Sequence, residues 1–200
     1  MSGEGLKIPQ IIILASSSVN RIKLLKQIGI DPIIVKPECE ENLSKTLSPE
    51  NYAVETANIK IKWVYNKLVQ EKKYFDVIIA CDTIISMNDE IIGKPKDLED
   101  ARETLNKLNG KIHEVITGVV IKKKEGEIDK FYTRSKVKFR NNKTCVLEDY
   151  INTGEPLGHA GSYAIQKKGA ILIESIEGCY NNIVGLPLAE VYDKIRDQKL

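Results

Sequence analysis

The sequence has no long apolar run, no excess of charge of one sign and no closely spaced cysteines. Its 200 residues include 30 basic and 28 acidic side chains, which leaves a formal net charge of only +2. A nearly neutral chain has no overall field that would draw it to nucleic acid or to an anionic membrane. No apolar segment approaches the ~20 residues that span a bilayer, and the first residues lack the basic and apolar regions of a signal peptide. We therefore expect neither a nucleic-acid nor a membrane partner.

The cysteines are few and far apart. Cys39, Cys81, Cys145 and Cys179 form no CxxC pair, which argues against a zinc knuckle, a redox motif or a local disulfide framework. A reducing compartment is the simplest interpretation, so the expected localisation is cytoplasmic. Because 42% of the residues are apolar, the chain can bury a core without disulfides or a structural metal.

The apolar pattern predicts one α/β domain over residues 11–200, after a flexible N-terminus of residues 1–10. Short β-branched runs indicate strands, and apolar residues at helical spacing indicate helices. The expected strands are 11–15, 33–35, 77–87 and 170–176, with two long strands between residues 113 and 140 joined near 125–127. The expected helices are 22–28, 50–71 and 97–108, a short helix capped by Thr144, and a last helix from about Pro187. His113 is expected to pack or pair within its strand.

Three serines, Ser16 to Ser18, break the first strand just before a predicted helix. Backbone amides and hydroxyls in such a turn can face a phosphate, with the positive end of the helix behind them. Arg21 adds positive charge nearby. The alternative is that these serines are ordinary helix caps.

Asp82 is the single charge in the run VIIACDTIIS, whose other residues favour burial. A carboxylate removed from water costs several kcal/mol unless a cation, a metal ion or a raised pKa compensates, and such sites are often functional. The alternative is an aspartate that bonds neighbouring backbone. Thr83 should project to the opposite face of the strand.

Other polar residues are less distinctive when taken one at a time. Lys60 lies at the edge of the apolar stripe of its helix, where it could face the core or reach water. The turn Gly93-Lys94-Pro95 follows the Asp82 strand and could direct Lys94 toward the carboxylate. Glu41, in an acidic loop, is either solvated or a metal ligand. The amide of Gln166 could read the edge of a base because it offers both donor and acceptor.

In order along the chain, these segments resemble the Maf family. The resemblance is carried by LASSSVNRIKLL, the helix with Lys60, CDTII, GKP, HEVITGV, AGSYAIQ and YNNIVGLPL. It implies an α/β fold similar to inosine triphosphate pyrophosphatases, in which a mixed central sheet is flanked by helices and two lobes form a cleft. It further implies a homodimer that hydrolyses nucleoside triphosphates to monophosphate and pyrophosphate with Mg²⁺ or Mn²⁺, as nucleotide-pool house-cleaning.

The resemblance also assigns roles to residues. It implies Asp82 as the catalytic base, Glu41 and Asp82 as metal ligands, and the following residues as phosphate-binding: Ser16, Ser18, Arg21, Lys60 and Lys94. AGSYAIQ is similar to the branch that acts on dTTP and UTP, and Thr83 and Gln166 match positions linked to this choice. One departure is Asn20, which stands where the family usually has arginine, at a position linked to specificity. A catalytically weak nucleotide-binding regulator of cell division is therefore the alternative function.

Overall fold

The computed structural model describes residues 9–40, 43, 47–126 and 128–196. They form a mixed sheet in the order β2-β1-β3-β5-β6-β7, with β4 paired to β3. β1 runs parallel to β2 and β3, and the other pairs are antiparallel. The strands are β1 (Ile12–Leu14), β2 (Ile33–Ile34), β3 (Val77–Met87), β4 (Glu90–Ile92), β5 (Ile112–Lys123), β6 (Ile128–Phe139) and β7 (Ile173–Glu177).

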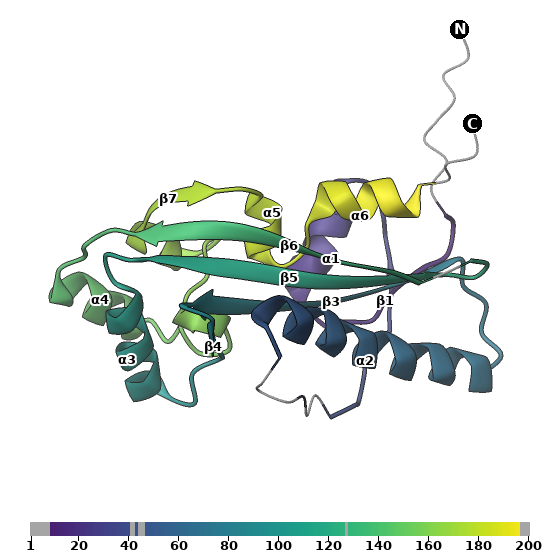
Figure 1. Ribbon diagram of the computed structural model, residues 1–200, viewed down its shortest axis with the longest axis horizontal. Helices are drawn as coiled ribbons and strands as arrows, with labels where there is room; N and C mark the ends of the chain where they lie inside the picture. Colours follow the sequence, from purple (N-terminus) through teal and green to yellow (C-terminus); the bar gives the residue numbers. More distant parts are fainter. Residues whose placement is uncertain (1–8, 41–42, 44–46, 127, 197–200) are drawn as a thin grey trace, which may run out of the picture.

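Helices cover both faces of the sheet, so the mixed sheet flanked by helices is confirmed (Figure 1). α2 lies along one face, whereas α1 and α6 lie on the other. The helices are α1 (Val19–Gln27), α2 (Pro49–Gln70), α3 (Leu98–Leu108), α4 (Thr144–Ile151), α5 (Tyr180–Val184) and α6 (Leu188–Ile195), with 3₁₀ turns η1 (Ala160–Ser162) and η2 (Lys168–Leu172). The described part of the chain holds no helix with the length and apolar character that crossing a bilayer requires.

Strand β3 is buried on both faces, as its apolar run predicts. Ala80 packs in the core under α2, whereas Cys81 packs in the core under α1 and α6. Because successive side chains of a strand point to opposite faces, Asp82 lies on the α2 face and Thr83 on the opposite one. The predicted separation of these two side chains is thus confirmed by the contacts that each makes.

Helix α2 lies unusually close to β5 at Gly118. This glycine is paired with Asp82 in the β3–β5 register, and a Cβ built on it would lie 2.3 Å from the carbonyl carbon of Ala53. Only a residue without a side chain leaves room for the helix backbone at this point. The HEVITGV motif therefore contains the glycine that seats α2 on the sheet beside Asp82.

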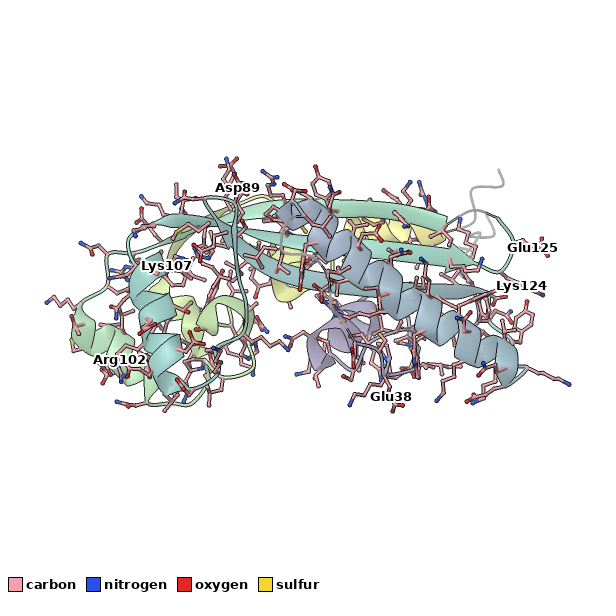
Figure 2. All side chains as sticks on the ribbon, turned by 60° about the horizontal axis from the view of Figure 1, so that its bottom comes forward. Glu38, Asp89, Arg102, Lys107, Lys124 and Glu125 are labelled. Atoms are coloured by element: carbon pink, nitrogen blue, oxygen red, sulfur yellow. The ribbon has the colours of Figure 1, made fainter. Side chains whose placement is uncertain are left out.

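The long strands β3, β5 and β6 run through two lobes (Figure 1). One lobe has α1, α2 and α6, and the other has α3, α4, β7 and the 3₁₀ turns around a separate core cluster. In the second lobe Arg102 on α3 forms a bidentate salt bridge with Glu148 on α4. Nε donates to Oε1 at 2.7 Å and Nη2 donates to Oε2 at 2.9 Å. Figure 2 shows Arg102 at one end of the molecule and the β5–β6 turn, marked by Lys124 and Glu125, at the other.

Several element bounds differ from the expected ones. β4 and α5 have no counterpart in the prediction because three and five residues are too short to show a period. β7 begins at Ile173, since residues 168–172 form the 3₁₀ turn η2. The expected cap at Thr144 is wrong: Lys143 occupies the N-cap and makes no side-chain cap bond. Residues 1–8 of the predicted N-terminal segment lie outside the described residues.

Candidate active site

A cavity of about 630 Å³ lies between the two lobes. Its walls come from the serine turn, the end of β2, the middle of β3, the Gly93-Lys94-Pro95 turn, residues 158–160 and 163–167, and residues 183–185. Every predicted site residue that the structure describes lines it, namely Ser16, Ser18, Asn20, Arg21, Lys60, Asp82, Thr83, Lys94 and Gln166. Glu41 lies outside the described residues.

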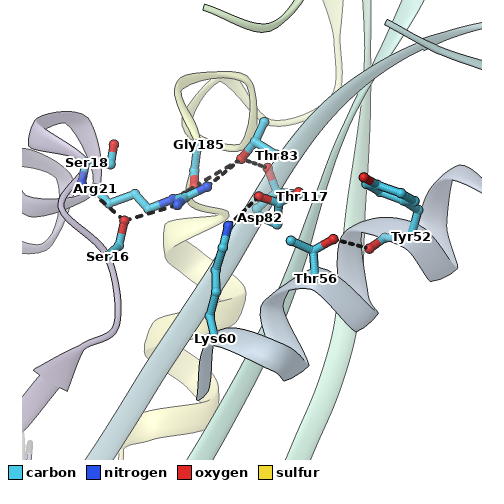
Figure 3. A network of polar contacts seen from close by, with 10 residues as sticks. All are labelled: Ser16, Ser18, Arg21, Tyr52, Thr56, Lys60, Asp82, Thr83, Thr117 and Gly185. Atoms are coloured by element: carbon cyan, nitrogen blue, oxygen red, sulfur yellow. Dashed lines mark hydrogen bonds and ion pairs between the residues drawn. The ribbon is translucent and has the colours of Figure 1, made fainter. Parts of the chain in front are cut away.

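Lys60 and Asp82 form an ion pair at the bottom of this site (Figure 3). Nζ of Lys60 lies 2.7 Å from Oδ1 of Asp82, and the two side chains are 11% and 16% exposed. Lys60 therefore turns toward the sheet and does not extend into bulk water. Oδ2 of Asp82 accepts no hydrogen bond from the other described residues, so this oxygen is available to a water molecule or an ion in the cavity.

Arg21 is buried and is bound by protein atoms (Figure 3). Its Nε donates to the carbonyl oxygen of Gly185 at 2.9 Å, Nη1 donates to Ser16 Oγ at 3.2 Å, and Nη2 donates to Thr83 Oγ1 at 3.1 Å. Three of the five guanidinium N–H groups are thus engaged, which leaves two for a ligand. Arg21 joins the serine turn, β3 and the end of α5.

The hydroxyl of Thr83 is engaged with the protein as well. Thr117 Oγ1 donates to the carbonyl oxygen of Asn182 at 3.1 Å, so its single proton is used. The 2.9 Å contact between Thr83 Oγ1 and Thr117 Oγ1 is then a hydrogen bond donated by Thr83, which itself accepts from Arg21. An influence of Thr83 on substrate choice would therefore act through Arg21 and the end of α5.

The serine turn is arranged differently from an ordinary cap. Ser18 occupies the N-cap of α1, but its side chain makes no cap hydrogen bond. Instead the backbone N–H of Ser18 donates to Ser16 Oγ at 3.1 Å. The ordinary-cap alternative is wrong for the Ser18 side chain, whose hydroxyl faces the cavity region beside the positive end of the helix.

The second lobe contributes the opposite wall. Gln166 lies there half-buried, and Tyr163 beside it is buried. The hydroxyl of Tyr163 lies 2.8 Å from Nε2 of His113, which is 1% exposed on β5. Burial lowers the pKa of His113 to about 4 and raises the pKa of Tyr163. His113 thus packs and pairs within its strand, as expected.

The cavity also contains cations that the motifs do not single out, Lys36 and Lys167. Lys36 follows β2, and β2 pairs in parallel with β1, whose end carries the serine turn. Parallel strands end at the same edge of a sheet. A parallel pairing of the two predicted strands at 11–15 and 33–35 would therefore have placed Lys36 beside the serine turn. Among the described residues, the lining has one carboxylate, Asp82, and five side chains with full positive charge: Arg21, Lys36, Lys60, Lys94 and Lys167.

The donor set suits one kind of metal site. Within the described residues no three His, Cys, Asp or Glu side chains converge on a point, so a closed site made by these residues alone is not present. Mg²⁺ commonly binds through one or two carboxylates together with substrate phosphates and water. Asp82, with its available Oδ2, fits that pattern, in which the nucleotide brings the remaining ligands.

Among solved structures, the chain resembles two Ham1 proteins. A HAM1 protein from Coxiella burnetii aligns with 92% of this chain and 96% of its own, with a TM-score of 0.48 and 12% identity. The Ham1 protein of Staphylococcus aureus aligns with 67% of this chain and 74% of its own, with a TM-score of 0.46 and 18% identity. Both likenesses are distant.

The similarity to curated sequences is much stronger. A dTTP/UTP pyrophosphatase from Thermosipho africanus is 43% identical over 94% of this chain and 93% of its own. Proteins with the same name from Dictyoglomus thermophilum and Clostridium botulinum strain Okra are 44% and 41% identical, over 90% and 88% of this chain and 92% and 91% of their own. A family model described as Maf-like protein matches residues 11–198. The chain therefore belongs to the Maf-like protein family.

Proposed function

We propose that this chain is a nucleoside triphosphate pyrophosphatase that hydrolyses dTTP and UTP to the monophosphate and pyrophosphate. The relatives named above carry that activity in their names. The observation that carries the proposal is the ion pair of Lys60 and Asp82, a single acid among cations in the described cavity lining. Such a lining suits a polyanion, and the acid supplies the group that hydrolysis of that polyanion needs.

The reaction begins with water held against the α-phosphate. Asp82 accepts a proton from this water through Oδ2 while the water oxygen bonds to the α-phosphorus. The bond from the α-phosphorus to the oxygen bridging the β-phosphate breaks, and pyrophosphate leaves with the electron pair. Lys60 keeps the carboxylate in place throughout, since it binds the other oxygen, Oδ1.

Charge on the leaving pyrophosphate is stabilised by groups already in position. Lys94 lines the cavity. Ser16 and Ser18 offer hydroxyls and the start of α1, and Arg21 offers its two remaining N–H groups. A divalent cation, Mg²⁺ or Mn²⁺, held by Asp82 and by Glu41, would add Lewis-acid stabilisation of phosphate charge when bound.

Gln166 is the proposed reader of the base. An amide can donate to one group and accept from its neighbour, and thymine and uracil present a carbonyl next to an N–H at the edge where cytosine presents an amino group next to a bare nitrogen. Gln166 lies in the wall opposite the serine turn, so a nucleotide with its phosphates at the turn can direct its base toward the amide. Asn20 and Thr83 affect substrate choice from the phosphate side.

The test is pyrophosphate release from a panel of dTTP, UTP, CTP, methylated pyrimidine nucleotides and 7-methyl-GTP, with Mg²⁺, Mn²⁺ or EDTA. We expect release from dTTP and UTP that needs the metal and is lost in Asp82→Asn. Lys62→Met, which removes an exposed lysine of α2, is the control and should keep wild-type rates. Nucleotide binding without pyrophosphate release from any member of the panel would contradict the proposal and support the regulator.

The setting of the enzyme is part of the same proposal. We infer clearance of non-standard nucleotides in the cytoplasm by a homodimer, from the family resemblance and from four widely spaced cysteines that form no CxxC pair, which favours a reducing compartment. Light scattering on the purified protein measures the assembly. A mass equal to one chain of 22.5 kDa would exclude the dimer.

A further inference from the structure

Residues 155–169 form one continuous segment of the second lobe, and the carboxylate of its first residue is hydrogen-bonded to the backbone at its other end. Glu155, at the start, accepts hydrogen bonds from the backbone N–H groups of Lys168 and Gly169, at 3.3 and 3.0 Å. It also accepts from the hydroxyl of Tyr150 at 3.2 Å. A loop whose ends are joined in this way behaves as a compact unit. We call residues 155–169 the base-side segment, since it carries Gln166.

The middle of the base-side segment is attached to the sheet through one buried hydrogen bond. Tyr163, 5% exposed, reaches His113 of β5 with a hydroxyl to Nε2 distance of 2.8 Å. Their rings and that of Phe139 pack edge to face, with centroids 4.9 to 5.4 Å apart. Nδ1 of His113 is buried without a hydrogen-bond partner. The Tyr163 hydroxyl is thus the one hydrogen-bond partner of this imidazole ring among the described residues.

The same segment is tied to the turn that carries Lys94. The backbone N–H of Gly161 donates to the carbonyl oxygen of Gly93 at 3.0 Å. At this point the chain takes a left-handed conformation, with φ of 66° at Gly161 and 62° at Ser162. A non-glycine residue keeps such a φ only where its surroundings determine it strongly, which is typical of functional sites. Lys94 and Gln166 are therefore parts of one connected wall.

We propose that His113 and Tyr163 are positioning residues for base discrimination, which act through the base-side segment to set where Gln166 stands. This rests on the proposed function, in which Gln166 distinguishes uracil and thymine from cytosine. His113 is absent from the cavity lining, and the Tyr163 hydroxyl is directed to His113, so neither polar group is placed to contact substrate. Hydrogen-bond recognition requires a geometry held to within ~0.5 Å, and a buried attachment to a central strand provides it.

Tyr163→Phe tests the proposal, because it removes the hydroxyl and keeps the ring. We expect the ratio of kcat/KM for UTP to that for CTP to fall about tenfold, the size of one lost hydrogen bond, with kcat for UTP changed much less. His113→Gln retains a side chain that can donate to or accept from the Tyr163 hydroxyl, and we expect it to keep most of the selectivity. His113→Leu should lose selectivity as Tyr163→Phe does.

Tyr132→Phe is the matched control, because Tyr132 is 51% exposed on β6. It should leave the ratio unchanged. If Tyr163→Phe is less stable to urea but keeps the wild-type UTP to CTP ratio, the pair is merely structural and the proposal is overturned.

Failure of the proposed function gives a different result. If the wild-type protein releases no pyrophosphate, the proposed function fails, and the pair is then tested by the ratio of UTP and CTP dissociation constants from calorimetry. The expected tenfold loss of this ratio in Tyr163→Phe would support positioning, and an unchanged ratio would overturn it.

Discussion

Lys60 and Asp82 meet through a 2.7 Å contact although one lies on a helix and the other on the sheet. The contact fixes one carboxylate oxygen and leaves the other without a partner among the described residues. The lysine therefore selects which oxygen of Asp82 faces the chemistry.

Replacing Asp82 and replacing Lys60 should reduce turnover in different ways. Asp82→Asn keeps the shape but removes the base, and we expect kcat to fall by 10²- to 10⁴-fold or more with nucleotide affinity largely retained. Lys60→Met removes both the positioning contact and a phosphate-facing charge, so kcat should fall and KM rise. Initial rates of pyrophosphate release measure both, with Lys62→Met as control. A wild-type kcat in Asp82→Asn would rule out the assigned base.

Gly118→Ala should separate the same two residues without altering either. The added methyl meets the backbone of α2 at Ala53, so the helix must move. Overpacking of this kind costs roughly 1–3 kcal/mol, and a moved helix carries Lys60 away from Asp82. We expect lower stability in urea and a kcat reduced more than tenfold. A variant with wild-type stability and rate would show that α2 yields freely at this point.

Arg21→Lys distinguishes a positioning role from simple phosphate binding. Lysine keeps the positive charge but cannot donate to Ser16, Thr83 and Gly185 together. We expect the free energy of unfolding without nucleotide to fall by about 2 kcal/mol, together with a loss of kcat. Lys23→Met, on the exposed face of the same helix, should change neither. An Arg21→Lys variant of wild-type stability would assign Arg21 to the substrate alone.

His113 should make stability depend on pH in weak acid. Burial lowers its pKa from 6.5 to about 4 in the folded state, so between these values the unfolded chain binds more protons. The contribution of His113 to the free energy of unfolding is therefore fully present above pH 6.5. It is lost as the pH falls to about 4, by roughly 3 kcal/mol in total. Urea unfolding of wild type and His113→Gln over this range gives the difference. Carboxylates titrate in both proteins and cancel. Parallel curves would contradict the prediction.

The sequence predicted the core of the site better than its connections. Asp82 stands out because a lone charge in a buried run is costly, and Lys60 because its spacing places it beside an apolar stripe. Periodicity assigns a face, however, and not a partner, so their contact was not predictable. Arg21 is a case of the same limit, since its acceptor at Gly185 is 164 positions away in sequence.

Two other groups illustrate what periodicity leaves out. Lys36 follows the predicted strand at 33–35, which the structure contains as β2, but only the parallel pairing of β2 with β1 places it at the cavity. The connection from Tyr163 to His113 depends on a loop whose left-handed turn at Ser162 no propensity indicates. Both features arise from tertiary packing between segments distant in the chain.

The continuity of β3 and β5 across both lobes limits how this protein can move. β3 pairs with β1 in the first lobe and with β4 in the second, and β5 pairs with it along the whole stretch from Val77 to Ser86. Enzymes that close two domains over a substrate usually bend at a few loop residues, and an unbroken ladder of strands offers no such hinge. We therefore expect the angle between the lobes to change little when nucleotide binds, and Asp82 to stand beside Lys60 before the substrate arrives.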